Sequence, residues 1–175
     1  NNTFSKTCVI PLAIAVDHRR HGQSRIKHCN VFCAKNIKKN RYFNDRCRSL
    51  GITSSDSDNY YLFYARIPFL PSIMHTGCGA IVLSHQIGCS LNYLYLDALY
   101  LGLPLVHNSD ALSKYGYYYP DSNVEVASLM IDQALQNHPH NLVDFDTKNK
   151  ELFKKFHPLN AQNVKAYLSR IRGLI

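Results

Sequence analysis

The sequence lacks most of the features that would place a chain in a membrane or assign it to a common enzyme class. Its 175 residues contain no uninterrupted run of 18 apolar residues, so we expect no membrane span. The chain does not begin with a charged region, an apolar stretch and a small-residue cleavage site, so we expect no secretory signal. The P-loop, GxSxG and GxGxxG patterns are also missing, which removes the usual fingerprints of P-loop NTPases, α/β-hydrolases and dinucleotide-binding enzymes.

The cysteines lack the spacing of a metal site. Six cysteines are present, at positions 8, 29, 33, 47, 78 and 89, and none of them forms a CxxC pair. Free, packed thiols are the commonest state of such residues. We therefore expect no metal and a reducing compartment, which is the cytoplasm of a bacterium or of a host cell if the source is viral.

Acidic residues are scarce in one part of the chain. The sequence has 20 basic and 12 acidic residues, a formal net charge of +8, and ten of the basic residues lie between His18 and Arg48 beside the single acid Asp45. This pattern is typical either of a solvated basic face or of a chain that attracts phosphate. Because no helix-turn-helix, zinc-finger or RRM signature accompanies the basic stretch, we do not expect nucleic acid as the main partner.

Strand-like and helix-like segments alternate from residue 28 onward. We expect strands at 28–36, 59–67, 79–85 and 103–108, a turn-rich segment at 109–120, and helices before residue 50 and at 68–77, 91–101, 122–137, 146–156 and 160–172. Ser122, three residues before Glu125, is the expected N-cap of the helix 122–137. The apolar segment 7–16 fits either a strand or a buried helix. The alternation predicts an α/β fold in one domain, 1–175, with a Rossmann-like parallel sheet sandwiched by helices.

Polar residues follow two of the expected strands. His85 and Gln86 end the strand 79–85, and the loop after them leads to Ser90 at the start of a helix. His107, Asn108 and Ser109 end the strand 103–108. Ligands of open α/β sheets bind at the carboxyl ends of strands, and unpaired N–H groups at a helix start favour an anion such as phosphate.

The helix 91–101 is apolar or aromatic nearly all the way round, yet it carries the acid Asp97. A carboxylate is costly to bury unless it is paired. Asp97 is therefore either an exposed acid on the solvent side or an acceptor for ligand hydroxyl groups, such as the two of a ribose.

Several segments resemble known proteins. An acid within a helix followed by Ala-Leu-x-x-Gly-x-Pro-Leu-Val, at 97–106, resembles the donor-binding half of GT-B glycosyltransferases. The segments SHQ (84–86), LNYLYLDALYLGLPLVHNS (91–109), GYYYP (116–120) and FHPLNAQNVKAYLSRI (156–171) resemble more closely a family of bacterial and viral proteins of uncharacterised activity. The opening NNTFSKTCVIPLAI resembles the first strand, loop and helix of that family.

The resemblance implies roles for individual residues. It implies that Asp97 binds ribose hydroxyls, that Ser90, Leu91 and Asn92 face the diphosphate, and that Lys6 reaches a phosphate. His85, Gln86, His107, Asn108 and Ser109 would lie beside the transferred sugar, and Tyr117 and Tyr118 would either stack on a base or sugar or belong to the core.

The same resemblance implies transfer of a sugar from a nucleotide-activated donor to a hydroxyl acceptor, without metal or cofactor. It also implies a partner, an N-terminal GT-B domain that this chain does not contain. The alternatives are a non-catalytic protein that binds a nucleotide or sugar phosphate and, third, a basic nucleic-acid-binding module.

Overall fold

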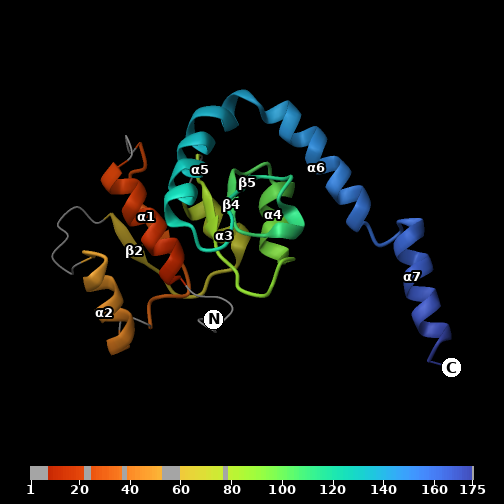
Figure 1. Cartoon of the computed structure of the whole chain (residues 1–175), viewed down its shortest axis with the longest axis horizontal. Helices are drawn as coiled ribbons and strands as arrows, with labels where there is room; N and C mark the ends of the chain where they lie inside the picture. The colour runs from red at the N-terminus through yellow and green to blue at the C-terminus, as the bar shows by residue number, and fades with distance from the viewer. Residues whose placement is uncertain (1–7, 22–24, 37–38, 53–59, 77–78, 175) are drawn as a thin grey trace.

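A computed structural model of the chain describes all residues except 1–7, 22–24, 37–38, 53–59, 77–78 and 175. In the described part, short parallel strands alternate with helices, which confirms the α/β class (Figure 1). The strands are β1 (Cys29–Val31), β2 (Tyr61–Phe63), β3 (Val82–Ser84), β4 (Leu105–His107) and β5 (Tyr117–Tyr118). The α-helices are α1 (Val9–His21), α2 (Arg41–Ser49), α3 (Phe69–Thr76), α4 (Tyr93–Tyr100), α5 (Val124–Asn137), α6 (Leu142–Phe156) and α7 (Ala161–Arg172).

The strands form two parallel sheets. One sheet pairs β1 with β2, and the other has the order β3-β4-β5. In the second sheet Leu83 lies opposite Val106, and Val106 lies opposite Tyr117. All three residues of β4 are buried, as expected for the central strand of a parallel sheet covered on both faces.

The alternation of side chains along β4 divides the core into two layers. Leu105 packs with Tyr95, Leu99 and other residues of α4 on one face of the sheet. Val106 points to the opposite face, where it packs against α1 and α5. Figure 1 shows the corresponding arrangement, with α1 and α5 next to each other and α4 on the other side of the sheet. Helices therefore cover both faces of β3-β4-β5.

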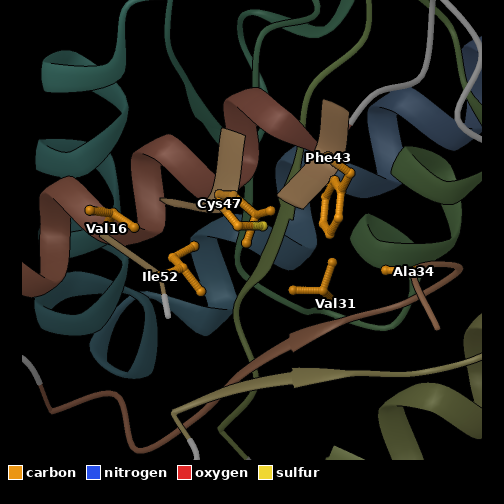
Figure 2. Close-up of a cluster of buried hydrophobic side chains, with 7 residues drawn as sticks. Val16, Val31, Ala34, Phe43, Cys47 and Ile52 are labelled. Atoms are coloured by element: carbon orange, nitrogen blue, oxygen red, sulfur yellow. The ribbon is translucent and has the colours of Figure 1, made fainter. Parts of the chain in front are cut away.

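A separate hydrophobic cluster supports the β1-β2 sheet. Its buried members come from α1, β1, α2 and the loops that follow β1 and α2: Leu12, Val16, Val31, Ala34, Phe43, Cys47 and Ile52. Figure 2 shows these side chains gathered between the sheet and the helices above it. The ring of Phe43 packs edge-on against Phe63 of β2, with 6.0 Å between ring centroids. This cluster fixes α2 over the smaller sheet.

The segment 7–16, which fitted either a strand or a helix, is helical from Val9 onward. Pro11 is tolerated because it stands in the first turn, where a backbone N–H would have no helical partner. Leu12 and Val16 contribute to the cluster over β1-β2, whereas Ile14 contributes to the one over β3-β4-β5. The helix α1 therefore packs on both sheets. The strand expected ahead of this helix lies outside the described residues.

The end of α4 is closed by a glycine-dependent motif. Gly102 has a φ of +64° and its N–H donates to the carbonyl of Leu99, while the N–H of Leu103 donates to the carbonyl of Ala98. These two bonds satisfy carbonyls that the helix leaves unpaired. The Gly102 carbonyl in turn lies 2.9 Å from Nε2 of the buried His138, which links the end of α4 to the end of α5.

Several expected boundaries were wrong. The strand expected at 28–36 ends at Val31, because the chain turns there and the N–H groups of Ala34 and Lys35 both donate to the carbonyl of Tyr64. The turn-rich segment 109–120 contains the short strand β5. The N-cap of α5 is Asn123 and not Ser122, since the Asn123 side chain accepts the N–H of Val126.

The C-terminal helices leave the body of the molecule. Figure 1 shows α6 running outward from the end of α5, with α7 at the far end of the chain. Only Asn149 and Leu152 of α6 are buried, and α7 has no buried residue. None of the helices in the described ranges is both long and apolar enough to cross a membrane.

Gly116 allows a test of the packing around β4. A Cβ atom at Gly116 would lie 2.7 Å from the carbonyl oxygen of Leu105, whereas one at Gly102 would meet nothing within 4 Å, although φ is positive at both positions. Gly102→Ala should cost about 1–2 kcal/mol of unfolding free energy for the left-handed backbone alone. Gly116→Ala should cost about 1–3 kcal/mol more, because the backbone of β4 must also move.

Urea unfolding of both variants and the parent chain measures this difference. Gly102→Ala is the matched control, because it measures the cost of the left-handed backbone alone. Equal losses in the two variants would show that the approach of residue 116 to β4 is not as close as described.

Candidate functional site

A polar cavity of about 270 Å³ lies where the strands β3, β4 and β5 end. Three segments line it, namely 85–90 after β3, 108–110 after β4 and 121–122 after β5. Because the strands are parallel, their carboxyl ends meet at one edge of the sheet. Ligand sites of α/β proteins are found at this edge.

Asn108 holds the first two segments together. Its Oδ1 accepts the backbone N–H of Gln86 at 2.9 Å, and its Nδ2 donates to the Gln86 carbonyl at 2.8 Å. One side chain therefore satisfies both the backbone N–H and the carbonyl of Gln86, as a residue of a neighbouring strand would do. The pair of bonds fixes the floor of the cavity, and Ser109 adds to it because its hydroxyl donates to the Ser90 carbonyl.

His85 is a buried side chain of the cavity wall, with 3% of its surface exposed. Its Nδ1 lies 3.1 Å from the hydroxyl of Tyr119, and its Nε2 lies 3.4 Å from the Ser122 hydroxyl. Burial lowers the pKa of His85 below its usual value of 6.5. The imidazole is therefore neutral at neutral pH, and it offers a hydrogen-bonding group without a positive charge.

The cavity is acidic. Asp110 and Asp121 line it, and no lysine or arginine stands among its described lining residues. Asp110 accepts a hydrogen bond from the Tyr118 hydroxyl. Asp121 has a φ of +51°, a left-handed conformation that is uncommon for a residue other than glycine. Two carboxylates beside a neutral histidine and amide groups suit hydroxyl groups better than phosphate.

His107 does not line the cavity, although it follows the same strand. It is fully buried, its Nε2 lies 2.7 Å from the carbonyl of Tyr115, and its Nδ1 accepts the N–H of Ser109. Both ring nitrogens are occupied by the backbone. The expectation that His107 contacts a sugar was wrong, because the alternation along β4 turns this side chain toward α4 and the Tyr95 ring.

Tyr117 also belongs to the core. It is 6% exposed and packs with Phe145, with 5.5 Å between the ring centroids. Of the two alternatives for Tyr117, its burial bears out a place in the core, and Tyr117 does not line this cavity. Tyr118 instead contacts the site indirectly, through its bond to Asp110.

The loop that leads into α4 lines the cavity as far as Ser90, and the helix itself does not. The helix begins at Tyr93, two residues later than expected, with Asn92 as its N-cap. The Asn92 side chain accepts the N–H of Leu94, so part of the first turn is already satisfied. Ser90 lines the cavity, whereas Leu91 and Asn92 do not.

Asp97 is exposed and does not line the cavity. It is the fifth residue of α4, a little more than one turn from its start. Its helical neighbours Tyr93 and Tyr100 are 85% and 76% exposed. The acid therefore lies on the solvent side of α4 within an aromatic surface, and it is separate from the carboxylates of the cavity.

Comparison with known protein families gives a match that covers most of the chain. The sequence profile of a family described as a protein of unknown function, DUF2827, matches residues 1–171. The chain belongs to this family. No curated protein and no solved structure matches it.

Other candidate residues of this family member lie elsewhere. Lys6 is outside the described residues. In the basic stretch, Arg20 donates to the carbonyl of Leu50, and Arg48 forms an ion pair with Asp45 at 3.1 Å. All five cysteines that the structure describes are free, and burial raises the pKa of Cys29 to about 12, so this thiol is uncharged. No group of three potential metal ligands occurs within the described ranges.

The two buried histidines predict a pH dependence of stability. Burial lowers the pKa of both His85 and His107 below 6.5. The folded state therefore favours the neutral rings, and the stability they confer is present above the unfolded pKa and lost as the pH falls below about 6.5. Each ring contributes up to about 1.4 kcal/mol per pH unit in that range.

Urea unfolding at pH 7.5, 6.5 and 5.5 measures the slope. His107→Gln and His85→Gln should each flatten it, whereas His140→Gln, at an exposed histidine, should leave it unchanged. An unchanged slope in both buried variants would contradict the assignment of neutral rings.

Proposed function

We propose that the chain is the donor-binding half of a glycosyltransferase, with the polar cavity as the site of the transferred sugar. The observation that carries the proposal is the convergence of the segments after β3, β4 and β5 on one cavity of hydroxyl-binding groups. Asp110 and Asp121 accept hydrogen bonds, and the Ser122 hydroxyl both donates and accepts them. This donor set suits the many hydroxyls of a sugar.

The strand order supports a Rossmann-like fold. In the doubly wound order 3-2-1-4-5-6, strand 3 pairs with strand 2 and strands 4, 5 and 6 follow one another. Suppose that β1 to β5 correspond to strands 2 to 6 of this order. The pair β1-β2 then corresponds to strands 2 and 3, and the sheet β3-β4-β5 corresponds to strands 4, 5 and 6. The first strand of that order would precede α1, outside the described residues. The packing of α1 on both sheets agrees with this arrangement.

The charge distribution supports separate binding surfaces for the sugar, the diphosphate and the nucleoside of the donor. The carboxylates of the cavity would repel a diphosphate held among them. The diphosphate therefore lies at the mouth, toward Ser90 and the backbone N–H groups at the start of α4. From there the ribose and base reach the exposed surface of α4, where Asp97 accepts the ribose hydroxyls between Tyr93 and Tyr100.

Transfer to an acceptor requires a second domain. The cavity is slightly smaller than the range of about 300–1,000 Å³ that is usual for ligand pockets, as expected of a site with one wall missing.

The helix α7 carries exposed apolar residues that recur at helical spacing, which is typical of a surface that a partner covers. These residues are Val164, Tyr167, Leu168 and Ile171. We propose that the partner is an N-terminal GT-B domain that carries the hydroxyl acceptor.

A second candidate is a protein that binds the nucleotide sugar without transferring it. The loop Ile87–Gly88–Cys89 lines the cavity and brings no carboxylate or base to it. Donor hydrolysis separates the two candidates, since a transferase joined to its N-terminal domain hydrolyses the donor slowly in water and a binding protein does not.

Calorimetric titration of the chain with UDP, GDP and their sugar derivatives tests the proposal. One nucleotide should bind saturably, and its sugar derivative should bind more tightly. Asp121→Asn should weaken the sugar derivative about tenfold, a loss of about 1.4 kcal/mol, and leave the free nucleotide unchanged. Asp97→Asn should weaken both, because it acts on the ribose.

Asp144→Asn is the matched control, since Asp144 is an exposed acid at the start of α6 and lines neither surface. The proposal fails if no nucleotide binds to the folded chain, or if Asp144→Asn and Asp121→Asn have the same effect.

A further inference from the structure

A second cavity, of about 330 Å³, lies at the opposite end of β5. It is bounded by the segment 113–118 that leads into and along β5, by α5 and by the first turns of α6. The two cavities share no lining residue. The second cavity is therefore a separate feature, and an argument about it does not depend on the proposed donor site.

One wall of the second cavity is apolar and aromatic. Tyr117, Met130 and Phe145 line it, and the rings of Tyr117 and Phe145 meet at an angle of 41°. His138 extends the aromatic packing behind Phe145, with 4.8 Å between ring centroids. Such a wall favours a flat, apolar group of a ligand.

Two buried polar atoms at this cavity have no partner among the described residues. Tyr117 and Asn149 both line the cavity and are each 6% exposed. The Tyr117 hydroxyl and the Asn149 Oδ1 are both unpaired. The Asn149 Nδ2 donates to the carbonyl of Leu99 at 2.9 Å, which leaves Oδ1 available as an acceptor. Buried polar groups are rarely left unpaired, so both atoms require a hydrogen-bond partner that the described residues do not supply, either water or a ligand.

The rim of the second cavity is basic. Lys114 and Lys148 line it, and no acid stands among its described lining residues. Neither lysine forms an ion pair with a described carboxylate, whereas Lys150 of the same helix pairs with Asp146 at 2.5 Å. This charge is opposite to that of the first cavity, and it selects an anion.

We propose that the second cavity binds a small aromatic anion that also carries a hydrogen-bond donor, of the class of the hydroxylated aromatic carboxylates. The ring lies against Tyr117, Met130 and Phe145, and the carboxylate faces Lys114 and Lys148. The hydroxyl group of the ligand donates to Asn149. A ligand held in this way connects β5 and α5 to the base of α6.

NMR titration of the isotope-labelled chain with 4-hydroxybenzoate tests this site. Saturable shifts should gather on the residues of the second cavity and leave the segments 85–90 and 121–122 unchanged. 4-Hydroxybenzyl alcohol, which lacks the anionic group, and benzoate, which lacks the donor, should each bind about tenfold more weakly, equal to about 1.4 kcal/mol.

Variants on the surface of α6 provide the control. Lys148→Gln should weaken 4-hydroxybenzoate severalfold, and Lys150→Gln, two residues along the same helix, should not. Lys114→Gln repeats the test from the other side of the cavity. Absence of saturable shifts in the folded chain at millimolar 4-hydroxybenzoate would overturn the proposal, as would equal binding of the acid and the neutral alcohol.

Discussion

The burial of α1 is the constraint on which the rest of the fold depends. In the described part of the chain the sheets β1-β2 and β3-β4-β5 share no hydrogen-bonded strand pair, and α1 packs on both. Full burial of a residue such as Leu12 or Ile14 contributes about 1.5–3 kcal/mol. The hydrogen bond between Nε2 of the buried His18 and Oδ1 of Asp132, at 2.9 Å, fastens α1 to α5. Because α5 begins just beyond the cavity, the position of α1 also determines where Ser122 stands.

The polar cavity depends on a second constraint, the complete pairing of the groups that form its floor. Asn108 satisfies both backbone groups of Gln86, and His107 is held below the floor by two backbone bonds. These bonds compensate for the desolvation that burial of such groups costs. Asp121 and Ser122 take no part in this pairing of the floor and line the cavity.

The charges of the two cavities differ in a way that the net charge conceals. The chain carries a formal charge of +8, yet acids line the cavity at the carboxyl end of β5 and lysines line the cavity at its other end. Much of the basic stretch is occupied by internal contacts, such as that of Arg20 with the Leu50 carbonyl. Local charge, rather than the net charge, therefore decides what each site attracts.

The sequence was sufficient to predict the strands around Val82 and Leu105 and the helix α4 between them, because continuous apolar runs bounded by glycine and proline are strong local signals. It also placed His85, Gln86, Ser90, Asn108 and Ser109 near one another, since parallel strands bring their carboxyl ends together.

Other features depend on tertiary contacts that local patterns do not encode. The inward turn of His107 follows from the strand register, and the choice of Asn123 over Ser122 as a cap follows from the contact of Ser122 with His85. Asp121 was missed because β5, the strand before it, has only two residues, and Asp110 was missed although it directly follows the predicted Ser109. The Pro120–Asp121 turn after the tyrosine triplet was the one signal that pointed to Asp121.

The most direct test of the central claim is the location of a bound nucleotide sugar on the isotope-labelled chain, measured by NMR shift mapping with whichever UDP- or GDP-sugar binds. The account predicts that the sugar moves the resonances of 85–90, 108–110 and 121–122, and that the nucleotide alone moves only the start and outer face of α4. Shifts that avoid the ends of β3, β4 and β5 would contradict it.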